Sequence, residues 1–327
     1  MPQFYGKQES LKKEEILMKH FNLQEKRPKV LLFGNGMTYS EDTEWDKIIT
    51  KLSKDNAPQM PAEVPYSVLA TIKTSLSDTE RHNKYGEYFK TKYPYQEHLL
   101  LTELLKIPFD AVLTTNYTYE AEECFVKDFH EKKEETLKKY WLQAKKYQNK
   151  RTDPKYLLHT YNHMTDGQVE QDIWHIHGEV RRKSSMILTH DEYSHLISEL
   201  VLYNKERGRD YYNYKEDVQF ESWVDYLLLG DLYIIGFGFV FTEFDLWWLL
   251  TRRLKEETGS GRLVFFTPES EDQNDKAICS ALQAMGATVE HCGVSENDEN
   301  AHQTMYRKAI EIIREVGMRK TMEKVFA

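Results

Sequence analysis

The 327-residue sequence has few cysteines, no surplus of positive charge and no long apolar run. Its three cysteines are Cys124, Cys279 and Cys292, and none belongs to a Cys-x-x-Cys pair. Three scattered thiols can build neither a disulfide framework nor a four-cysteine zinc site. The cysteine content therefore favours a protein of the reducing cytoplasm.

The chain carries 44 Lys and Arg against 53 Asp and Glu, which gives a formal net charge of -9. Proteins that cover long stretches of nucleic acid need a basic surface to neutralise phosphates, so we expect no direct nucleic-acid partner. The longest apolar stretch, residues 232–241, is too short to span a bilayer, and the charged residues 1–25 do not resemble a signal peptide. We expect a folded cytoplasmic protein that makes no membrane contact.

Short apolar runs alternate with helical patterns along the chain. Apolar runs of four to eight residues bounded by turn signals indicate buried strands. We expect strands at 29–33, 109–115, 172–177, 186–189, 232–235, 262–267 and 287–291. Their alternation with helices predicts an α/β fold, with a Rossmann-like, mainly parallel sheet and helices on both faces.

Apolar residues at helical spacing predict the intervening helices. The expected helices are 11–21, one through Trp45, Ile48, Ile49 and Leu52 that packs on the sheet, 66–105 with a break near Tyr85-Gly86, 119–148, 191–204, 220–229, one starting at a capping box of Thr242 and Asp245, 276–285, and 301–316 ended by Gly317. The segment 205–217 has the composition of a surface insertion. We interpret residues 1–327 as one domain with an N-terminal helix and helical insertions at about 119–170 and 190–230.

Three predicted strands end in polar or glycine-rich tails. The tails are Gly34-Asn35-Gly36, Thr114-Thr115-Asn116 and His177-Gly178. Open α/β sheets bind ligands in the crevice beyond the carboxyl ends of their strands. We therefore expect the three tails to meet in one binding site.

The glycine pair Gly34-x-Gly36 lies between a predicted strand and a predicted helix, where glycine lets the backbone approach a phosphate or ribose closely. The third glycine of the dinucleotide fingerprint is replaced by Tyr39. Three following carboxylates would repel a pyrophosphate unless they point away from it: Glu41, Asp42 and Glu44. Alone, the pattern fits a tight turn as well as a nucleotide site.

Asn116 and His177 carry the polar groups best suited to chemistry. An amide can both donate and accept hydrogen bonds toward a ribose or a water, although asparagine after a strand also closes turns. On a regular strand His175 and His177 would share one face, with His177 nearest the crevice and Gly178 leaving room for a ligand. A lone histidine at a strand end is often only structural, but three such tails in succession favour a functional site.

The ordered motifs resemble the sirtuin-like domain of bacterial antiphage defence proteins over about residues 29–313. They are Gly34-Asn35-Gly36-Met37-Thr38, Thr114-Thr115-Asn116-Tyr117, His175-Ile176-His177-Gly178, Ile187-Leu188-Thr189-x-x-x-Tyr193 and Ile235-Gly236-Phe237-Gly238. The first motif departs from the Gly-Ala-Gly-x-Ser of sirtuins and is closer to AbiH-type abortive-infection proteins. The resemblance implies that Asn116 and His177 are catalytic. It further implies an NAD site that includes Gly34, Asn35, Gly36, Thr38, Thr115, Tyr117, Gly236, Gly238 and Asp245.

The same resemblance implies cleavage of the bond between nicotinamide and ribose. Protein-deacylating sirtuins carry a four-cysteine zinc module that this chain cannot make, so we expect no deacylation. The expected activity is NAD hydrolysis to nicotinamide and ADP-ribose, without a metal, by an abortive-infection effector that a protein partner or self-assembly activates. Asn116 would orient the ribose or water, and His177, neutral near pH 7, would accept a proton.

Two other functions remain open from the sequence. A non-catalytic sensor or partner module that binds NAD or ADP-ribose would explain the incomplete glycine fingerprint. A metal-dependent hydrolase would use the spacing of His159 with His163 and of His175 with His177, although no carboxylate spacing completes a known site.

Overall fold

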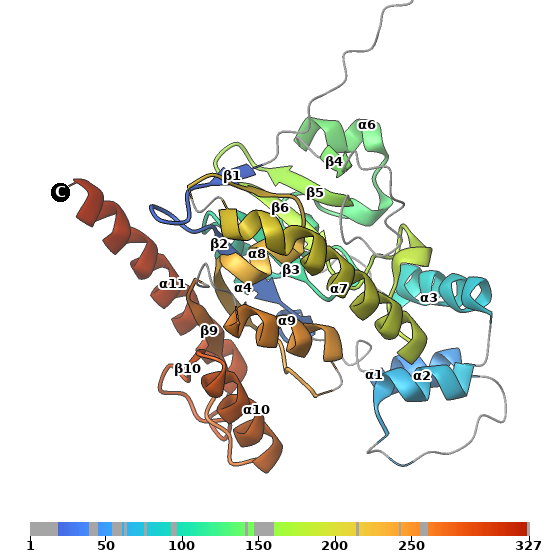
Figure 1. The fold of residues 1–327 in the computed structure, drawn as a ribbon. Helices are drawn as coiled ribbons and strands as arrows, with labels where there is room; N and C mark the ends of the chain where they lie inside the picture. Colours follow the sequence, from blue (N-terminus) through green and yellow to red (C-terminus); the bar gives the residue numbers. More distant parts are fainter. Residues whose placement is uncertain are drawn as a thin grey trace, which may run out of the picture.

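The structure, a computed structural model, describes residues 19–38, 45–53, 61, 64–74, 77–92, 97–140, 143–146, 160–213, 216–241, 243–255 and 261–325. A central sheet with helices on both faces forms the body of the protein (Figure 1). In chain order the strands are β1 (Lys19–Phe21), β2 (Lys29–Phe33), β3 (Ala111–Thr114), β4 (Gln143–Lys146), β5 (Thr160–Thr165), β6 (Glu170–His175), β7 (Val218–Phe220), β8 (Asp231–Ile235), β9 (Leu263–Phe266) and β10 (Thr288–Glu290).

The central sheet has eight strands in the order β10-β9-β8-β2-β3-β6-β5-β4. All pairings from β10 to β6 are parallel, and β5 and β4 join antiparallel at one edge. The chain runs from β2 to β3 and β6 on one side, then returns to β8 on the other side of β2. The predicted mainly parallel α/β fold is confirmed, and its topological switch point lies between β2 and β8.

Helices connect the strands and cover both faces of the sheet. They are α1 (Trp45–Leu52), α2 (Tyr66–Thr74), α3 (Asp78–Lys92), α4 (Leu99–Leu105), α5 (Glu120–Glu123), α6 (Glu134–Leu137), α7 (His190–Asn213), α8 (Trp223–Leu229), α9 (Phe244–Leu254), α10 (Gln273–Ala284) and α11 (Ala301–Val325), with short 3-10 turns at Asn35–Met37, Phe129–Glu131, Lys138–Tyr140 and Lys183–Ser185. No helix in the described part of the chain is long and apolar enough to cross a membrane.

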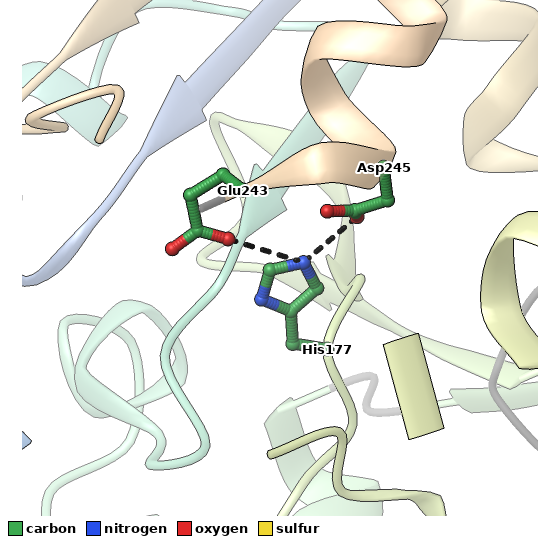
Figure 2. Close-up of side chains that lie close together, drawn as sticks. All are labelled: His177, Glu243 and Asp245. Carbon is green, nitrogen blue, oxygen red and sulfur yellow. Dashed lines mark hydrogen bonds and ion pairs between the residues drawn. The ribbon is translucent and has the colours of Figure 1, made fainter. Parts of the chain in front are cut away.

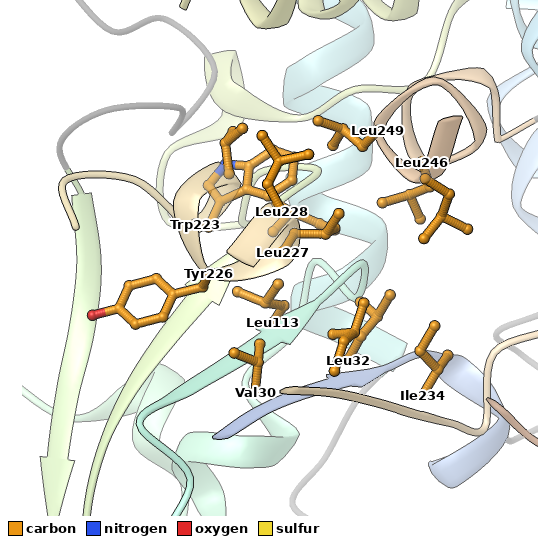
Figure 3. Packing of buried hydrophobic residues seen from close by; sticks show 14 of the residues in the cluster. Val30, Leu32, Leu113, Trp223, Tyr226, Leu227, Leu228, Ile234, Leu246 and Leu249 are labelled. Carbon is orange, nitrogen blue, oxygen red and sulfur yellow. The ribbon is translucent and has the colours of Figure 1, made fainter. Parts of the chain in front are cut away.

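The sheet is buried on both faces because successive side chains of each strand point to opposite sides. Val30 and Leu32 of β2 pack in one core with residues of α7, α8, α9 and α10. Figure 3 shows the part of this core that α8 and α9 form with the sheet. Leu31 and Phe33 of the same strand pack in a second core with α4 and α11. Each of these four side chains is at most 1% exposed, and burial of one such side chain contributes about 1.5–3 kcal/mol.

A third, smaller core joins α1, α2 and α3 at one side of the sheet (Figure 1). The predicted helix through Ile48, Ile49 and Leu52 is confirmed, but its apolar face does not pack on the sheet. These side chains instead meet Tyr117 and residues of α2 and α3. Helical spacing identifies the apolar face of a helix but carries no information about the surface that covers it.

The long helix expected at 119–148 is wrong. The segment holds two four-residue helices, α5 and α6, and then β4, which pairs with β5. Asp128 adopts a left-handed conformation with φ of 54°, which a continuous helix cannot contain. The region of the predicted helical insertion at 119–170 therefore extends the sheet by two strands, and α8 of the second region, 190–230, belongs to the main core.

Several other expectations for the elements are corrected. Residues 186–189 form no strand, because no described strand pairs with them. Met186 and Leu188 pack into the small core, and Ile187 packs into the sheet core. Helix α3 continues through Gly86, where a Cβ would lie 2.3 Å from Cε of Lys183.

The remaining corrections concern the ends of helices. Helix α7 continues into the segment expected as a surface insertion, and α11 continues past Gly317, a residue that helices tolerate at about 1 kcal/mol relative to alanine. Of the predicted helix 11–21, residues 11–18 lie outside the described residues. The rest is β1, whose partner β7 lies two hundred residues away in the sequence.

Candidate functional site

Two glycine-containing loops meet at the switch point of the sheet. The Gly36 amide donates a hydrogen bond of 2.9 Å to the Gly236 carbonyl. A Cβ on Gly34 would lie 2.6 Å from the Phe237 ring, and a Cβ on Gly36 would lie 2.8 Å from the Gly236 oxygen. The close approach of these loops explains both glycines. Gly238 is different, because a Cβ there would meet nothing within 4 Å.

Two cavities flank the joined loops and share Gly36, Gly236, Phe237 and Gly238 in their walls. The first has a volume of about 250 Å³ and lies on the side of α1, Asn116 and His177. The second has a volume of about 260 Å³ and reaches Thr267, Ser270 and Asp275 on the side of β9 and α10. Both cavities lie at the carboxyl ends of the strands, the position where open α/β sheets bind ligands.

Asn116 follows β3 and lines the first cavity. Its Nδ2 donates to Oγ1 of Thr38 at 3.1 Å, and its backbone amide donates to Oγ1 of Thr114 at 3.1 Å. Its backbone carbonyl accepts a 2.8 Å hydrogen bond from Nδ1 of His175. The side-chain Oδ1 has no partner among the described residues and can accept a hydrogen bond from a ligand.

His175 holds the backbone carbonyl of Asn116 in place. It is 3% exposed, and its Nε2 lies 2.8 Å from Glu122, a fully buried carboxylate. Burial by itself would lower the pKa of His175, but the charge and hydrogen bond of Glu122 raise that pKa to about 9. His175 is therefore a positively charged support that donates from both ring nitrogens, with Asn116 held at one of them.

His177 lies two residues beyond the end of β6 and also lines the first cavity. Its backbone carbonyl accepts a 2.9 Å bond from the Ile187 amide, and the next residue, Gly178, turns the chain with φ of 89°. The expected common face of His175 and His177 is wrong, since the strand ends at His175. The two rings have separate carboxylate partners.

The partners of His177 come from the start of α9 (Figure 2). Its Nε2 lies 2.9 Å from Oδ2 of Asp245 and 4.0 Å from Oε2 of Glu243. Asp245 is fully buried, whereas the Glu243 side chain is 10% exposed and lines the first cavity. Because Asp245 accepts from Nε2–H, the neutral form of His177 keeps its lone pair on Nδ1, which has no partner among the described residues.

Charge coupling changes the acidity of these groups. Burial acts to lower the pKa of His177, but the charge and hydrogen bond of Asp245, and then Glu243, raise it above its ordinary value. Burial raises the pKa of Glu243 to about 7, even though His177 acts in the opposite direction. The expectation that His177 is simply neutral near pH 7 is therefore revised toward the protonated form in the free protein.

Two tyrosines close the wall behind these groups. Tyr193 donates a 3.2 Å hydrogen bond to Oε2 of Glu243, and its ring packs edge-on at 5.4 Å from the His177 ring. Tyr117 donates its hydroxyl to the Ile187 carbonyl. Burial raises the pKa of both phenols well above 10, so both stay neutral donors.

The structure brings most of the sequence-predicted residues to one crevice. Eight of them line the first cavity, namely Asn35, Gly36, Thr115, Asn116, Tyr117, His177, Gly236 and Gly238. Three lie behind the walls. Gly34 packs against the second loop, Thr38 holds Asn116, and Asp245 holds His177. Tyr39 and the carboxylates Glu41, Asp42 and Glu44 lie outside the described residues.

Sequence reasoning missed Glu243 and assigned Asp245 partly to a capping box. Helix α9 has Glu243 at its N-cap without a side-chain capping bond, while Thr242 lies outside the described residues. The carboxylate of Asp245 instead pairs with His177, 68 residues away in the chain. The only local signal was the pair of acids at i and i+2 before an apolar helix, which normally indicates favourable charge at a helix N-terminus.

The same three side chains have the composition of a metal site. Ligand atoms of His177, Glu243 and Asp245 lie within 4.8 Å of one another, and one imidazole with two carboxylates can bind a divalent cation. The histidine spacings noted in the sequence do not form such a site together. His163 pairs with Asp172 at 2.8 Å, His175 and His177 diverge, and His159 lies outside the described residues.

Comparison with known proteins relates the chain that carries this site to a protein family. A family model described as the SIR2-like domain matches residues 110–289, more than half of the chain. The matched segment includes Asn116, His177, Glu243 and Asp245, and begins after the Gly34 turn. No curated protein matches the sequence.

Proposed function

Because the chain belongs to the SIR2-like domain family, which indicates an NAD-related activity, we propose that it hydrolyses NAD to nicotinamide and ADP-ribose. The observation that carries this proposal is the cavity that presents both Asn116 and His177, each supported from behind by a buried partner. Side chains held in this way are preorganised to orient a reacting sugar.

The two adjacent cavities suit the two halves of a dinucleotide. The first cavity, with Asn116, His177 and Glu243, would hold the nicotinamide and its ribose, while the second would hold the adenosine half. The shared segment from Gly236 to Gly238 would lie beside the pyrophosphate. None of the described residues that line the two cavities is lysine or arginine, so backbone amides and hydroxyl groups such as that of Ser270 would bind the phosphates.

The reaction breaks the bond between ribose C1′ and the pyridinium nitrogen. The bonding electron pair moves to that nitrogen, neutral nicotinamide leaves, and water adds to C1′ with release of one proton. The transition state resembles an oxocarbenium ion, so orientation of the ribose and stabilisation of positive charge both lower the barrier. Asn116 would orient the ribose or water through Oδ1. His177, after it has lost its Nδ1 proton, would accept a ribose hydroxyl proton at Nδ1 while Asp245 holds Nε2.

A non-catalytic NAD or ADP-ribose sensor is the second candidate. Acidic groups favour it, because Asp275 and Glu296 line the second cavity and would weaken binding of a pyrophosphate placed there. Binding without turnover by wild-type protein, measured by calorimetry with NAD and ADP-ribose, would support this candidate over hydrolysis.

The principal test is nicotinamide release from NAD by the full chain and by its Asn116→Ala and His177→Ala variants. We expect each substitution to lower turnover by about 100-fold or more, within the range for removal of a positioned acid or base. Turnover that is unchanged in both variants would reject these residues as the active site. Protein deacylation, which we do not expect, can be followed in the same samples with an acetylated peptide.

We also propose that the activity serves antiphage defence by depletion of NAD. The test is NAD concentration in cells that express the chain, before and after phage infection, with Asn116→Ala as the matched control. A fall in NAD that appears after infection and requires Asn116 supports this role. Equal NAD levels in the two strains after infection would contradict it.

A further inference from the structure

Glu243 is the carboxylate of the cluster of His177, Glu243 and Asp245 that lines the first cavity. Asp245 is fully buried and touches His177, whereas the Glu243 side chain is 10% exposed and forms part of the first cavity wall together with Asn116 and His177. The backbone around it is fixed, because the Glu243 amide donates to the Val240 carbonyl at 3.0 Å and its own carbonyl accepts from Trp247 at 3.1 Å.

The surroundings of Glu243 leave one carboxylate oxygen for a ligand. Oε2 accepts from Tyr193 at 3.2 Å and lies 4.0 Å from His177. Oε1 has no partner among the described residues. A buried glutamate with a purely structural role normally has its oxygens hydrogen-bonded within the protein, and a glutamate turned toward a cavity does not need this.

We propose that Glu243 is a second catalytic residue, whose carboxylate faces the reacting ribose carbon and takes the proton of the attacking water. This inference rests on the proposed NAD hydrolysis. As the C1′–nitrogen bond breaks, the negative charge of Glu243 stabilises the positive charge that develops on C1′ and the ring oxygen. As the water oxygen bonds to C1′, one water proton moves to Glu243 and later to solvent, so the reaction balances without any further reactant.

The positions of His177 and Glu243 give the two residues separate roles. His177 meets Asp245 through Nε2 and keeps Nδ1 for a ribose hydroxyl, which leaves the water without a base unless Glu243 supplies it. Among the described residues, four titratable groups face Glu243: His177, Asp245, Tyr193 and Tyr117. Burial raises the pKa of Glu243 to about 7, close to the pH at which a general base works best.

The experiment compares Glu243→Gln, Glu243→Asp and Glu243→Ala in the full chain, with nicotinamide release and NAD binding measured separately. Glu243→Gln keeps the shape and removes the charge, so we expect kcat to fall by about 100-fold or more while the dissociation constant of NAD changes little. Glu243→Asp keeps the charge and should retain more activity than Glu243→Gln. Added formate should restore turnover to Glu243→Ala, because a small carboxylate can occupy the space of the missing one.

A matched control is Glu123→Gln. Burial also raises the pKa of Glu123, to about 8, but this residue pairs with His130 and lines neither cavity. Turnover should therefore stay near the wild-type value in Glu123→Gln and fall only in Glu243→Gln.

Two outcomes separate the inference from the function on which it rests. Turnover in Glu243→Gln within threefold of an active wild type, with no formate effect in Glu243→Ala, overturns the catalytic role of Glu243 and leaves NAD hydrolysis intact. Wild-type protein that binds NAD but releases no nicotinamide, in purified form and in infected cells, overturns both.

Discussion

The substitution Asp245→Asn tests the support of His177 with little change in shape. Asp245 is completely buried and its Oδ2 lies 2.9 Å from Nε2 of His177. A hydrogen bond to a charged group contributes about 1.5–3 kcal/mol to stability. Glu243 remains 4.0 Å from the ring in the variant, so we expect a loss of about 2 kcal/mol in the free energy of unfolding at pH 6, within that range.

The loss of unfolding free energy in Asp245→Asn should depend on pH in a defined direction. The pKa of His177 is raised in the folded protein above its ordinary value of 6.5, so its pairing with Asp245 stabilises the fold fully below pH 6.5. That contribution disappears as the pH rises through the folded pKa, because the histidine then loses its proton. The difference in stability between wild type and Asp245→Asn should therefore be largest near pH 6 and much smaller near pH 9.

Urea unfolding at both pH values measures this difference, and a double-mutant cycle with His177→Gln isolates the pairwise term. We expect a coupling free energy above about 1 kcal/mol at pH 6 that becomes smaller as the pH rises through the folded pKa of His177. Nicotinamide release should fall by about 100-fold or more in Asp245→Asn, because an amide that holds Nε2 no longer stabilises the protonated ring. Equal coupling at both pH values would refute the argument that His177 is held in its charged form.

Three further predictions concern the same site. Tyr193→Phe removes a hydrogen bond that lowers the pKa of Glu243, so the fall in turnover at acid pH should begin at a higher pH than in wild type. A fall at the wild-type pH would show that protonation of Glu243 does not cause it. Gly178→Ala should destabilise the fold and reduce turnover, since the residue has φ of 89° and a Cβ would lie 2.3 Å from the Ser185 oxygen. A variant that unfolds at the same urea concentration as wild type would contradict this. Exhaustive treatment with a chelator should leave nicotinamide release within twofold of the untreated value. A loss that one divalent cation restores would instead identify His177, Glu243 and Asp245 as a metal site.

Local pattern was a good guide to the strands of the sheet. Val30 to Phe33 and Leu232 to Ile235 are apolar without interruption, and both are buried on both faces as central parallel strands. The polar tails after β2, β3 and β6 were expected in one crevice, because parallel strands end at the same edge. Asn116 and His177 do line one cavity.

Local pattern failed where a residue far away in the chain decides the conformation. The charged repeat after Tyr119 has helical spacing, yet its end becomes an edge strand that pairs with β5. The apolar residues Met186 and Leu188 have strand character, but they pack into the small core and belong to no described strand. Propensity is a weak guide in such segments, because tertiary packing outweighs it.

The sequence by itself determined a mainly parallel α/β fold with a ligand crevice at its strand ends, since periodicity, turn residues and the order of the polar motifs are all local properties. Only the tertiary structure decided which polar groups contact one another. It separates His175, which holds Asn116 with Glu122, from His177, which meets Glu243 and Asp245. Burial and charge coupling between distant segments set the protonation of these groups, and no spacing along the chain encodes that contact.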